Sequence, residues 1–246
     1  MGLKEPGLRG SLRNVSVGID AIPDASIFDN PIYRFNYNQV TANDGDTGFS
    51  LPETLGGLSD ATAEGNPTFK ADKSGTPAGD YDGTDDAHAI TSDSQAPSGT
   101  DDFGFAALVW FKSTSDFDII YSFGNDNRGE SVSLGSDNGT PILFTLGPDH
   151  VTASGGSITT GQWATIGGWT ENGGTDAYVT FDGEQVGSET GADSPNLSNS
   201  NHAIGYEKYS NSRYADVFIG DMIVMQASQA ESYYSTYNTE WMDILS

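Results

Sequence analysis

The chain of 246 residues contains no cysteine. Disulfide bonds and thiolate metal sites are therefore excluded. It has no run of about 18 apolar residues, so no segment is expected to insert into a membrane. Residues 1–15 have neither the apolar stretch of a secretory signal nor the paired arginines of a twin-arginine signal. We therefore expect no export directed by this segment.

Basic residues are scarce, since ten Lys and Arg stand against 35 Asp and Glu, and the net charge is −25. Such a surface repels nucleic acid and anionic lipid, so neither is an expected partner of the main body. An acidic composition can indicate disorder, but 11% aromatic residues and repeated strand–turn patterns favour a folded chain. At about 1 M salt the Debye length is near 3 Å, which screens the repulsion. We therefore predict a protein of a high-salt environment.

Turn-forming residues are abundant, including 31 glycines, and indicate many short strands. The clearest pattern lies in residues 162–188, where Asp182-Gly183 is typical of a two-residue hairpin turn. The turn predicts three cross-strand pairs: Phe181 with Glu184, Val179 with Val186, and Ala177 with Ser188. We predict that this segment is a β-meander at the centre of an antiparallel sheet.

Alternating apolar residues predict several further strands, at 32–37, 81–90, 119–123, 131–134, 142–146, 202–206 and 217–225. Phe103–Phe111 is apolar on both faces, as is typical of a central strand covered on both sides. A second hairpin turn is expected at Ser136–Gly139. In the last strand the alternation predicts two faces, one with Ile219, Asp221, Ile223 and Met225 and the other with Phe218, Met222 and Val224.

The two ends of the chain differ from this pattern. Ser228–Glu231 has the spacing of a capping box, so a short C-terminal helix is expected after it, with Tyr233, Tyr234 and Tyr237 as a packing stripe. Residues 1–28 are interrupted by Pro and Gly, and we predict an irregular arm there, followed by one domain at 29–246.

The arm carries positive charge, in contrast to the rest of the chain. Before Asp20, it contains Lys4, Arg9 and Arg13 against Glu5 alone. Two interpretations stay open: a frayed terminus, or an arm that docks on an acidic partner surface, including other copies of the same protein.

Six short motifs occur in the order found in one known family: Tyr81–Asp86 (Y-D-G-T-D-D), Phe105–Phe111 with its Trp110, Gly161–Trp163, Tyr178–Val186, Gly205, and Ile219–Met225 followed by Glu231. Residues 30–246 thereby resemble the concanavalin A-like lectin/glucanase superfamily, in particular its laminin-G-like jelly-roll branch. The resemblance implies an all-β fold, a two-sheet antiparallel β-sandwich of jelly-roll type. It implies no particular activity, because this fold occurs in lectins, adhesins, enzymes and scaffolds.

Catalytic and metal-binding patterns are sparse. The E-x-D-x-E triplet of glucanases with this fold is absent, and the three histidines, His88, His150 and His202, are too scattered for a zinc motif. We therefore expect no enzyme. Laminin-G-like domains often hold Ca²⁺ on a rim loop, and Asp44 and Asp46 offer the hard oxygen ligands that this ion prefers. The alternative is that they are solvated residues of an acidic loop.

Two loops combine polar, aromatic and scarce basic residues, and we select both as candidate ligand-binding segments. The candidates are Asn125, Asp126, Asn127 and Arg128 in the first loop and Tyr206, Lys208, Tyr209 and Arg213 in the second. Aromatic faces stack on sugar rings and amides bind hydroxyls, but Tyr and Arg also anchor protein interfaces. Contact with a glycan, contact between subunits and a solvated loop all stay open.

A surface-adhesion module without an export signal is consistent with a virion protein, which is assembled inside the cell. Residues 1–15 are also similar to the leader of appendage proteins in haloarchaeal tailed viruses. We predict a structural protein of the virion surface, of tail-fibre or capsid-turret type, in several copies. The arm would bind other virion proteins and the jelly roll a cell-surface glycan. The alternatives are an exported, extracellular lectin-like protein of a halophile and a glycoside hydrolase.

Overall fold

The computed structural model describes residues 22–56, 58–90, 96–114, 117–125, 130–146 (backbone only at 144–146), 152–207, 213–226 and 229–246. Lys4, Arg9 and Arg13 of the predicted arm lie outside this part of the chain. None of the helices in the described ranges has the length and apolar character needed to cross a bilayer.

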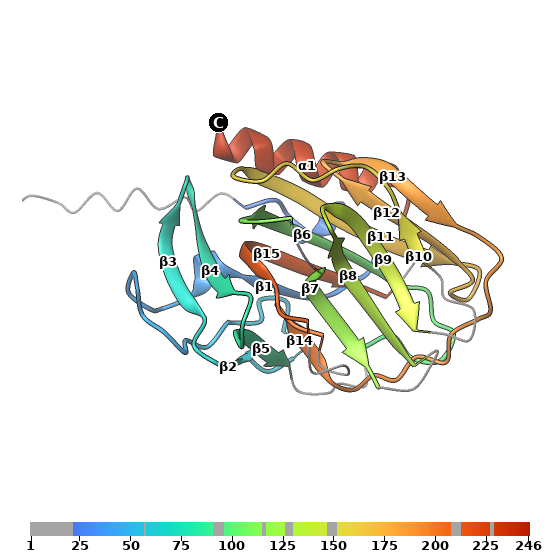
Figure 1. The fold of residues 1–246 in the computed structure, drawn as a ribbon, viewed down its shortest axis with the longest axis horizontal. Helices are drawn as coiled ribbons and strands as arrows, with labels where there is room; N and C mark the ends of the chain where they lie inside the picture. The colour runs from blue at the N-terminus through green and yellow to red at the C-terminus, as the bar shows by residue number, and fades with distance from the viewer. Residues whose placement is uncertain are drawn as a thin grey trace, which may run out of the picture.

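Two antiparallel sheets face one another (Figure 1) and confirm the predicted β-sandwich. In the first sheet the strands follow the order β13 (Glu184–Glu189), β12 (Asp176–Phe181), β11 (Trp163–Glu171), β6 (Gly104–Phe111), β15 (Asp216–Met225), β4 (Thr76–Asp82) and β3 (Thr68–Lys73). The strand β1 (Pro31–Asn36) also pairs with β15. The second sheet has the order β10 (Thr152–Ser154), β9 (Thr140–Leu146), β8 (Ser131–Asp137), β7 (Phe117–Gly124), β14 (His202–Ile204), β5 (Ala87–Ile90) and β2 (Thr62–Glu64).

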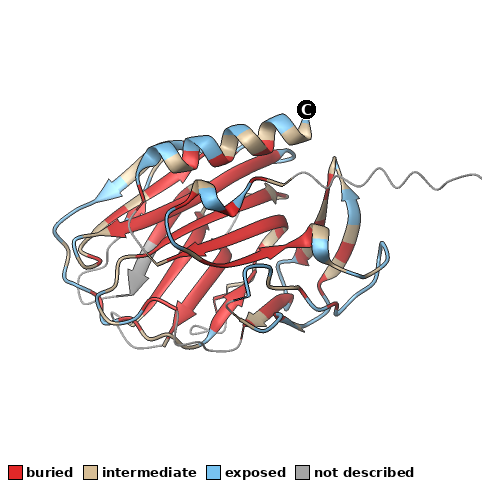
Figure 2. Ribbon diagram, turned by 180° about the vertical axis from the view of Figure 1, so that it is seen from behind, coloured by how far each residue is buried: buried red, intermediate tan, exposed pale blue. Residues whose placement is uncertain are grey.

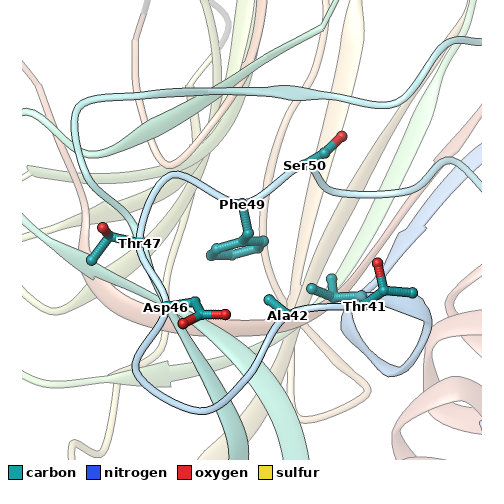
Figure 3. Close-up of a pocket in the computed structure, with 7 residues that line it drawn as sticks. Thr41, Ala42, Asp46, Thr47, Phe49 and Ser50 are labelled. Carbon is teal, nitrogen blue, oxygen red and sulfur yellow. The ribbon is translucent and has the colours of Figure 1, made fainter.

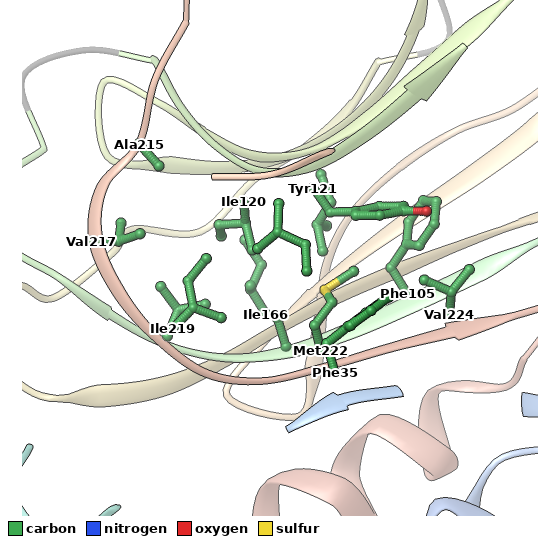
Figure 4. Packing of buried hydrophobic residues seen from close by; sticks show 14 of the residues in the cluster. Phe35, Phe105, Ile120, Tyr121, Ile166, Ala215, Val217, Ile219, Met222 and Val224 are labelled. Carbon is green, nitrogen blue, oxygen red and sulfur yellow. The ribbon is translucent and has the colours of Figure 1, made fainter. Parts of the chain in front are cut away.

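The main core lies between the sheets (Figure 4). Phe105, Ile166 and Met222 from the first sheet pack with Ile120 and Tyr121 from the second, and all five are at most 1% exposed. The opposite face of the first sheet is covered by the helix α1 (Glu231–Leu245), whose buried side faces the strands (Figure 2). The strand β6 is therefore covered on both faces, as predicted.

The meander formed by β11, β12 and β13 has the predicted turn, with Asp182 and Gly183 at positive φ and Phe181 opposite Glu184. The other two predicted pairs are wrong, because a β-bulge adds Val186 to β13 and shifts the register by one residue. Val179 lies opposite Gly187, and Ala177 lies opposite Glu189. The meander also lies at the edge of the sheet and not at its centre, since β13 is the outermost strand.

A second bulge, between Ile219 and Asp221, reverses the alternation along β15. Ile219 therefore faces the inter-sheet core, whereas Asp221, Ile223 and Met225 lie on the helix side. The predicted faces are wrong for Ile219 and also for Phe218, which lies on the helix side. The bulge also divides the free edge of β15: β4 pairs with its first half and β1 with its second half.

The helix α1 starts at Glu231, after Ala230 as N-cap, and no side-chain capping bond forms there. The predicted role of Glu231 in a capping box is wrong, because its Oε1 accepts a hydrogen bond from the Gln185 N–H on β13. Ser228 lies outside the described residues. Packing by the tyrosine stripe is confirmed: Tyr234 and Tyr237 are buried, and both rings contact Phe28.

Candidate ligand-binding site

A hollow with a volume of about 470 Å³ lies in the loop that follows the 3-10 turn η2 (Tyr37–Gln39), as Figure 3 shows. Its lining residues are Val40, Thr41, Ala42, Asp46, Thr47, Phe49 and Ser50. The volume falls within the range of about 300–1,000 Å³ that small ligands occupy. One carboxylate, three hydroxyl groups and one aromatic ring thus surround a single concavity.

Backbone hydrogen bonds fix this loop against β3. The Gly45 N–H donates to the Phe69 carbonyl, and the Phe69 N–H donates to the Asp46 carbonyl, both at 2.8 Å. The Asp46 Oδ2 accepts from the backbone and side-chain nitrogens of Asn43 at 2.8 and 3.0 Å, and its Oδ1 takes part in neither bond. The turn therefore holds the Asp46 carboxylate in place at the hollow.

The two residues predicted to bind calcium have different surroundings. Asp46 lines the hollow, whereas the Asp44 Oδ1 accepts a hydrogen bond from the Ala71 N–H of β3 at 3.0 Å. Asp44 is not among the lining residues. Calcium binding by this pair stays a prediction.

The Phe49 backbone is fixed by a series of buried hydrogen bonds that runs through His88 and Tyr81 to Tyr37. Its carbonyl accepts a hydrogen bond from the His88 Nε2 at 2.9 Å, and the His88 Nδ1 accepts one from the Tyr81 hydroxyl at 2.8 Å. The Tyr37 hydroxyl bonds in turn to Tyr81. Burial lowers the pKa of His88 to about 4, so this imidazole is neutral at ordinary pH. These hydrogen bonds fix the backbone of the hollow at Phe49 without a ligand.

A group of three carboxylates at Asp82, Asp85 and Asp86 belongs to the Y-D-G-T-D-D motif, and their oxygens lie within 4.8 Å of one another. Such oxygens could hold Ca²⁺. Hydrogen bonds already occupy the group: Asp86 accepts from the N–H groups of Asn66 and Asp82, and Asp82 accepts from that of Thr84. Burial raises the pKa of Asp86. In the sequence, this motif indicated only the family.

Of the eight predicted ligand-binding residues, the structure describes three, namely Asn125, Tyr206 and Arg213. Asn125 follows one end of β7, where its Oδ1 accepts from the Ser200 hydroxyl at 2.8 Å. The Tyr206 carbonyl accepts a hydrogen bond from the Ser122 hydroxyl within β7 at 2.7 Å, and the Arg213 guanidinium lies on the ring of Phe117 at the start of β7. At about 3.3 Å per residue, Ser122 lies roughly 10 Å and Phe117 roughly 26 Å before Asn125 along β7. Asp126, Asn127, Arg128, Lys208 and Tyr209 lie outside the described residues.

Tyr206 and Arg213 form a small cluster near the start of β7. The Tyr206 ring stacks on that of Tyr214 with centroids 4.2 Å apart, and Tyr206 is only 5% exposed. The Arg213 guanidinium lies 4.2 Å from the centroid of the Phe117 ring and bonds to the Glu207 carboxylate at 3.1 Å. Tyr206 therefore offers little surface to a ligand, and its role in binding stays a prediction.

A jelly roll of two antiparallel sheets, with its candidate site on a rim loop, has the architecture of a lectin-like domain. Residues 82–229 match the family described as "Concanavalin A-like lectin/glucanases superfamily", and the chain belongs to this superfamily. No curated protein matches the sequence significantly.

Several solved structures share the fold. One is domain 4 of AbnA, a GH43 extracellular arabinanase from Geobacillus stearothermophilus, in complex with arabinotriose (15% identity, TM-score 0.63, 85% of this chain and 98% of that chain covered). Another is the binding domain of Paraclostridial Mosquitocidal Protein 1 (10% identity, TM-score 0.66, 88% of this chain and 53% of that chain covered). A third is the binding domain of botulinum neurotoxin serotype G (14% identity, TM-score 0.62, 87% of this chain and 51% of that chain covered). The chain spans about half the length of the two toxin domains. At these identities the likeness concerns the fold alone.

Proposed function

We propose that this chain is a surface attachment protein whose jelly roll binds a glycan in the hollow around Phe49. The observation that supports this best is the lining of the hollow. The hydroxyls of Thr41, Thr47 and Ser50 and the Asp46 carboxylate can exchange hydrogen bonds with sugar hydroxyls, whereas Phe49 is 7% exposed and offers little ring surface. The arabinanase domain of the same fold, whose structure is in complex with arabinotriose, supports the proposal by analogy.

We further propose the surface of a halophilic virus as the setting, with a cellular, exported lectin-like protein as the alternative. The net charge of −25 supports a high-salt environment, and the basic residues Lys4, Arg9 and Arg13 support a docking arm. Several copies would raise the avidity of weak single sites.

The glycan site is tested with Thr47→Val, which keeps the shape of the side chain and removes one hydroxyl. A glycan array in concentrated salt, with and without chelator, selects the probe saccharide and also tests calcium. Calorimetry with that saccharide is expected to show about tenfold weaker binding for Thr47→Val, the equivalent of one lost hydrogen bond. The exposed Glu189 lies on the edge strand β13, and Glu189→Gln should bind like the wild type. Unchanged affinity of Thr47→Val, or an array without any bound glycan, would contradict the proposal.

The arm is tested by deleting residues 2–21. Residues 22–28, which the predicted arm includes, have to stay, because Phe28 is 2% exposed under α1 and the Pro23 carbonyl accepts from the Arg34 Nη1 at 2.5 Å. The truncated chain is expected to have the same unfolding temperature as the wild type, because the described domain stays intact. It should no longer assemble with its partners, and sedimentation compares the assembly formed by the truncated chain with that of the wild type. Retained assembly after this deletion would argue against a docking arm.

A further inference from the structure

The few basic residues of this acidic protein are not spread evenly. Five of them lie in the described part of the chain: Arg34, Lys70, Lys73, Lys112 and Arg213. Arg34 is buried against Asp221, and Arg213 is paired with Glu207. The three lysines gather on the helix-side face of the first sheet, around Trp110 and Phe218.

A row of aromatic side chains crosses this face. Trp163 on β11 lies opposite Trp110 on β6, and Trp110 lies opposite Phe218 on β15. The next residue in the row is Asp80 on β4, opposite Phe218. Trp110 and Phe218 are partly exposed, whereas Trp163 is 7% exposed. Four neighbouring strands spaced by about 4.8 Å give the row a length of roughly 14 Å.

Lys73 places its charge directly on this row. Its Nζ lies 3.8 Å from the centroid of the Trp110 ring and 4.5 Å from that of Phe218. The Lys73 carbonyl accepts a hydrogen bond from the Trp163 Nε1 at 2.9 Å, which ties the end of β3 to β11. Within the described ranges, no carboxylate oxygen lies within 4.0 Å of the Lys73 ammonium, although the protein has 35 acidic residues. The faces of the Trp110 and Phe218 rings hold an ammonium group that no ion pair within the described ranges neutralises.

The other two lysines share their carboxylates. The Lys112 Nζ lies 2.5 Å from Asp80 and 3.2 Å from Asp216, and the Lys70 Nζ lies 3.9 Å from Asp80. Three ammonium groups thus face two carboxylates, and all of these side chains are partly exposed. The aromatic–lysine row consists of Trp163, Trp110 and Phe218 with the surrounding Lys70, Lys73, Lys112, Asp80 and Asp216.

We propose that the aromatic–lysine row is a second binding site, for an acidic saccharide, that is, a sugar chain with carboxylate or sulfate groups. The outward side of the Lys73 ammonium would bind the anionic group in a charge-assisted hydrogen bond. The parts of the Trp110 and Phe218 rings that Lys73 and Lys112 leave exposed would contact the apolar face of a sugar, and Asp80 and Asp216 would accept from its hydroxyls. This combination distinguishes a saccharide from a simple anion.

The predicted high-salt setting favours such a contact site over long-range attraction. At about 1 M salt, charges are screened beyond about 3 Å, so only groups in direct contact retain their interaction. Apolar contact between a sugar and the rings involves no charge and is not weakened by this screening. The site shares no residue with the hollow around Phe49, so it does not depend on the proposed function of that hollow.

The test uses Lys73→Met, which keeps an apolar stem over the rings and removes the charge. Oligogalacturonate and a sulfated oligosaccharide serve as acidic probes, a maltooligosaccharide as the neutral probe, and an oligoglutamate as an anion without sugar rings. Tryptophan fluorescence and calorimetry measure binding in concentrated salt, and thermal unfolding verifies the fold of each variant. We expect at least one acidic saccharide to bind, with roughly tenfold weaker binding to Lys73→Met and unchanged binding to Thr47→Val.

Four outcomes would overturn the proposal. One is that neither acidic saccharide binds, and the second is that Lys73→Met binds as tightly as the wild type. The third is that oligoglutamate or the neutral sugar binds as tightly as the acidic saccharides, since the row would then not select a saccharide by its charge. A loss of binding in Thr47→Val alone would assign the probe to the hollow and would equally contradict a second site. If Lys73→Met fails to fold, Phe218→Leu provides the same comparison through the ring.

Discussion

Asp221→Asn is expected to lower the free energy of unfolding by about 3–5 kcal/mol, which is the cost of leaving one member of a buried ion pair without its partner. Asp221 is fully buried and accepts four hydrogen bonds. They come from the Arg34 Nε at 2.7 Å and its Nη2 at 2.6 Å, and from Asn36 and Tyr237 at 2.9 Å each. The variant retains the shape of the side chain but leaves the Arg34 guanidinium, 3% exposed, without a counter-charge. Denaturant unfolding at constant salt measures the loss.

This network joins parts of the chain that are far apart in sequence. Arg34 also donates to the Pro23 carbonyl, so the network links the N-terminal segment, β1, β15 and α1. Lys70→Met is the matched control, because its pair with Asp80 spans 3.9 Å and is partly exposed, and it should cost at most about 1 kcal/mol. Arg34→Met combined with Asp221→Asn should cost clearly less than the sum of the two single changes. The prediction would be wrong if the losses of unfolding free energy in the two single variants added up in the double variant. It would also be wrong if Asp221→Asn lost no more than Lys70→Met, because the Arg34–Asp221 pair would then not stabilise the packing of these elements.

The sequence predicted most of the strands but not β2, β3 and β10, nor the bulges. The predicted strand at 81–90 is wrong, because the end of β4 and the whole of β5 lie in different sheets. Alternation correctly placed Asp221 on the same face as Ile223 and Met225, because it describes a regular strand. It misplaced Ile219, because one extra residue at a bulge exchanges the two faces, and a bulge depends on the partner strand. The partner of Asp221 was equally hidden, since Arg34 lies 187 positions away. Local patterns define strands, whereas register and charge pairing depend on tertiary contacts.

The candidate site was less accessible to sequence reasoning than the fold. The hollow forms because backbone groups of Gly45 and Asp46 bond to Phe69, and such bonds leave no pattern in the side chains. Only Asp46 was selected in advance, as a calcium ligand. The sequence also predicted binding loops at Asn125 and Tyr206 from their chemistry, whereas Asn125 follows β7 and the Tyr206 carbonyl bonds to Ser122 within this strand. Residue chemistry identifies candidates, and only topology decides which of them meet.

His88 should make the stability of the protein depend on pH. Burial lowers its pKa from 6.5 to about 4 in the folded protein, where the imidazole is 0% exposed. Between these two values the unfolded chain binds the proton and the folded chain does not, so acid favours unfolding. The free energy of unfolding is therefore expected to have its full His88 contribution above pH 6.5 and to lose roughly 3 kcal/mol as the pH falls to about 4. Unfolding curves at several pH values in constant salt measure this loss.

Other groups titrate in the same range, so the His88 contribution has to be isolated. The pKa values of Asp86 and Asp182 are raised by burial, and such carboxyl groups act in the opposite direction. The difference between the wild type and His88→Gln at each pH removes these shared contributions. An NMR titration of the His88 ring should give a pKa near 4, and a value between 6 and 7 would contradict the prediction.

The hydrogen-bond directions explain why the folded protein resists this proton. The Phe49 carbonyl can only accept, so the His88 Nε2 must donate and the Nδ1 of the neutral ring must accept from Tyr81. The Tyr81 oxygen then accepts from the Tyr37 hydroxyl. A proton on Nδ1 would turn the Tyr81 hydroxyl toward Tyr37 and oblige the Tyr37 hydroxyl to find another acceptor inside the core. Because the same hydrogen bonds fix Phe49 at the hollow, acid should weaken the proposed glycan binding in the pH range where it lowers stability.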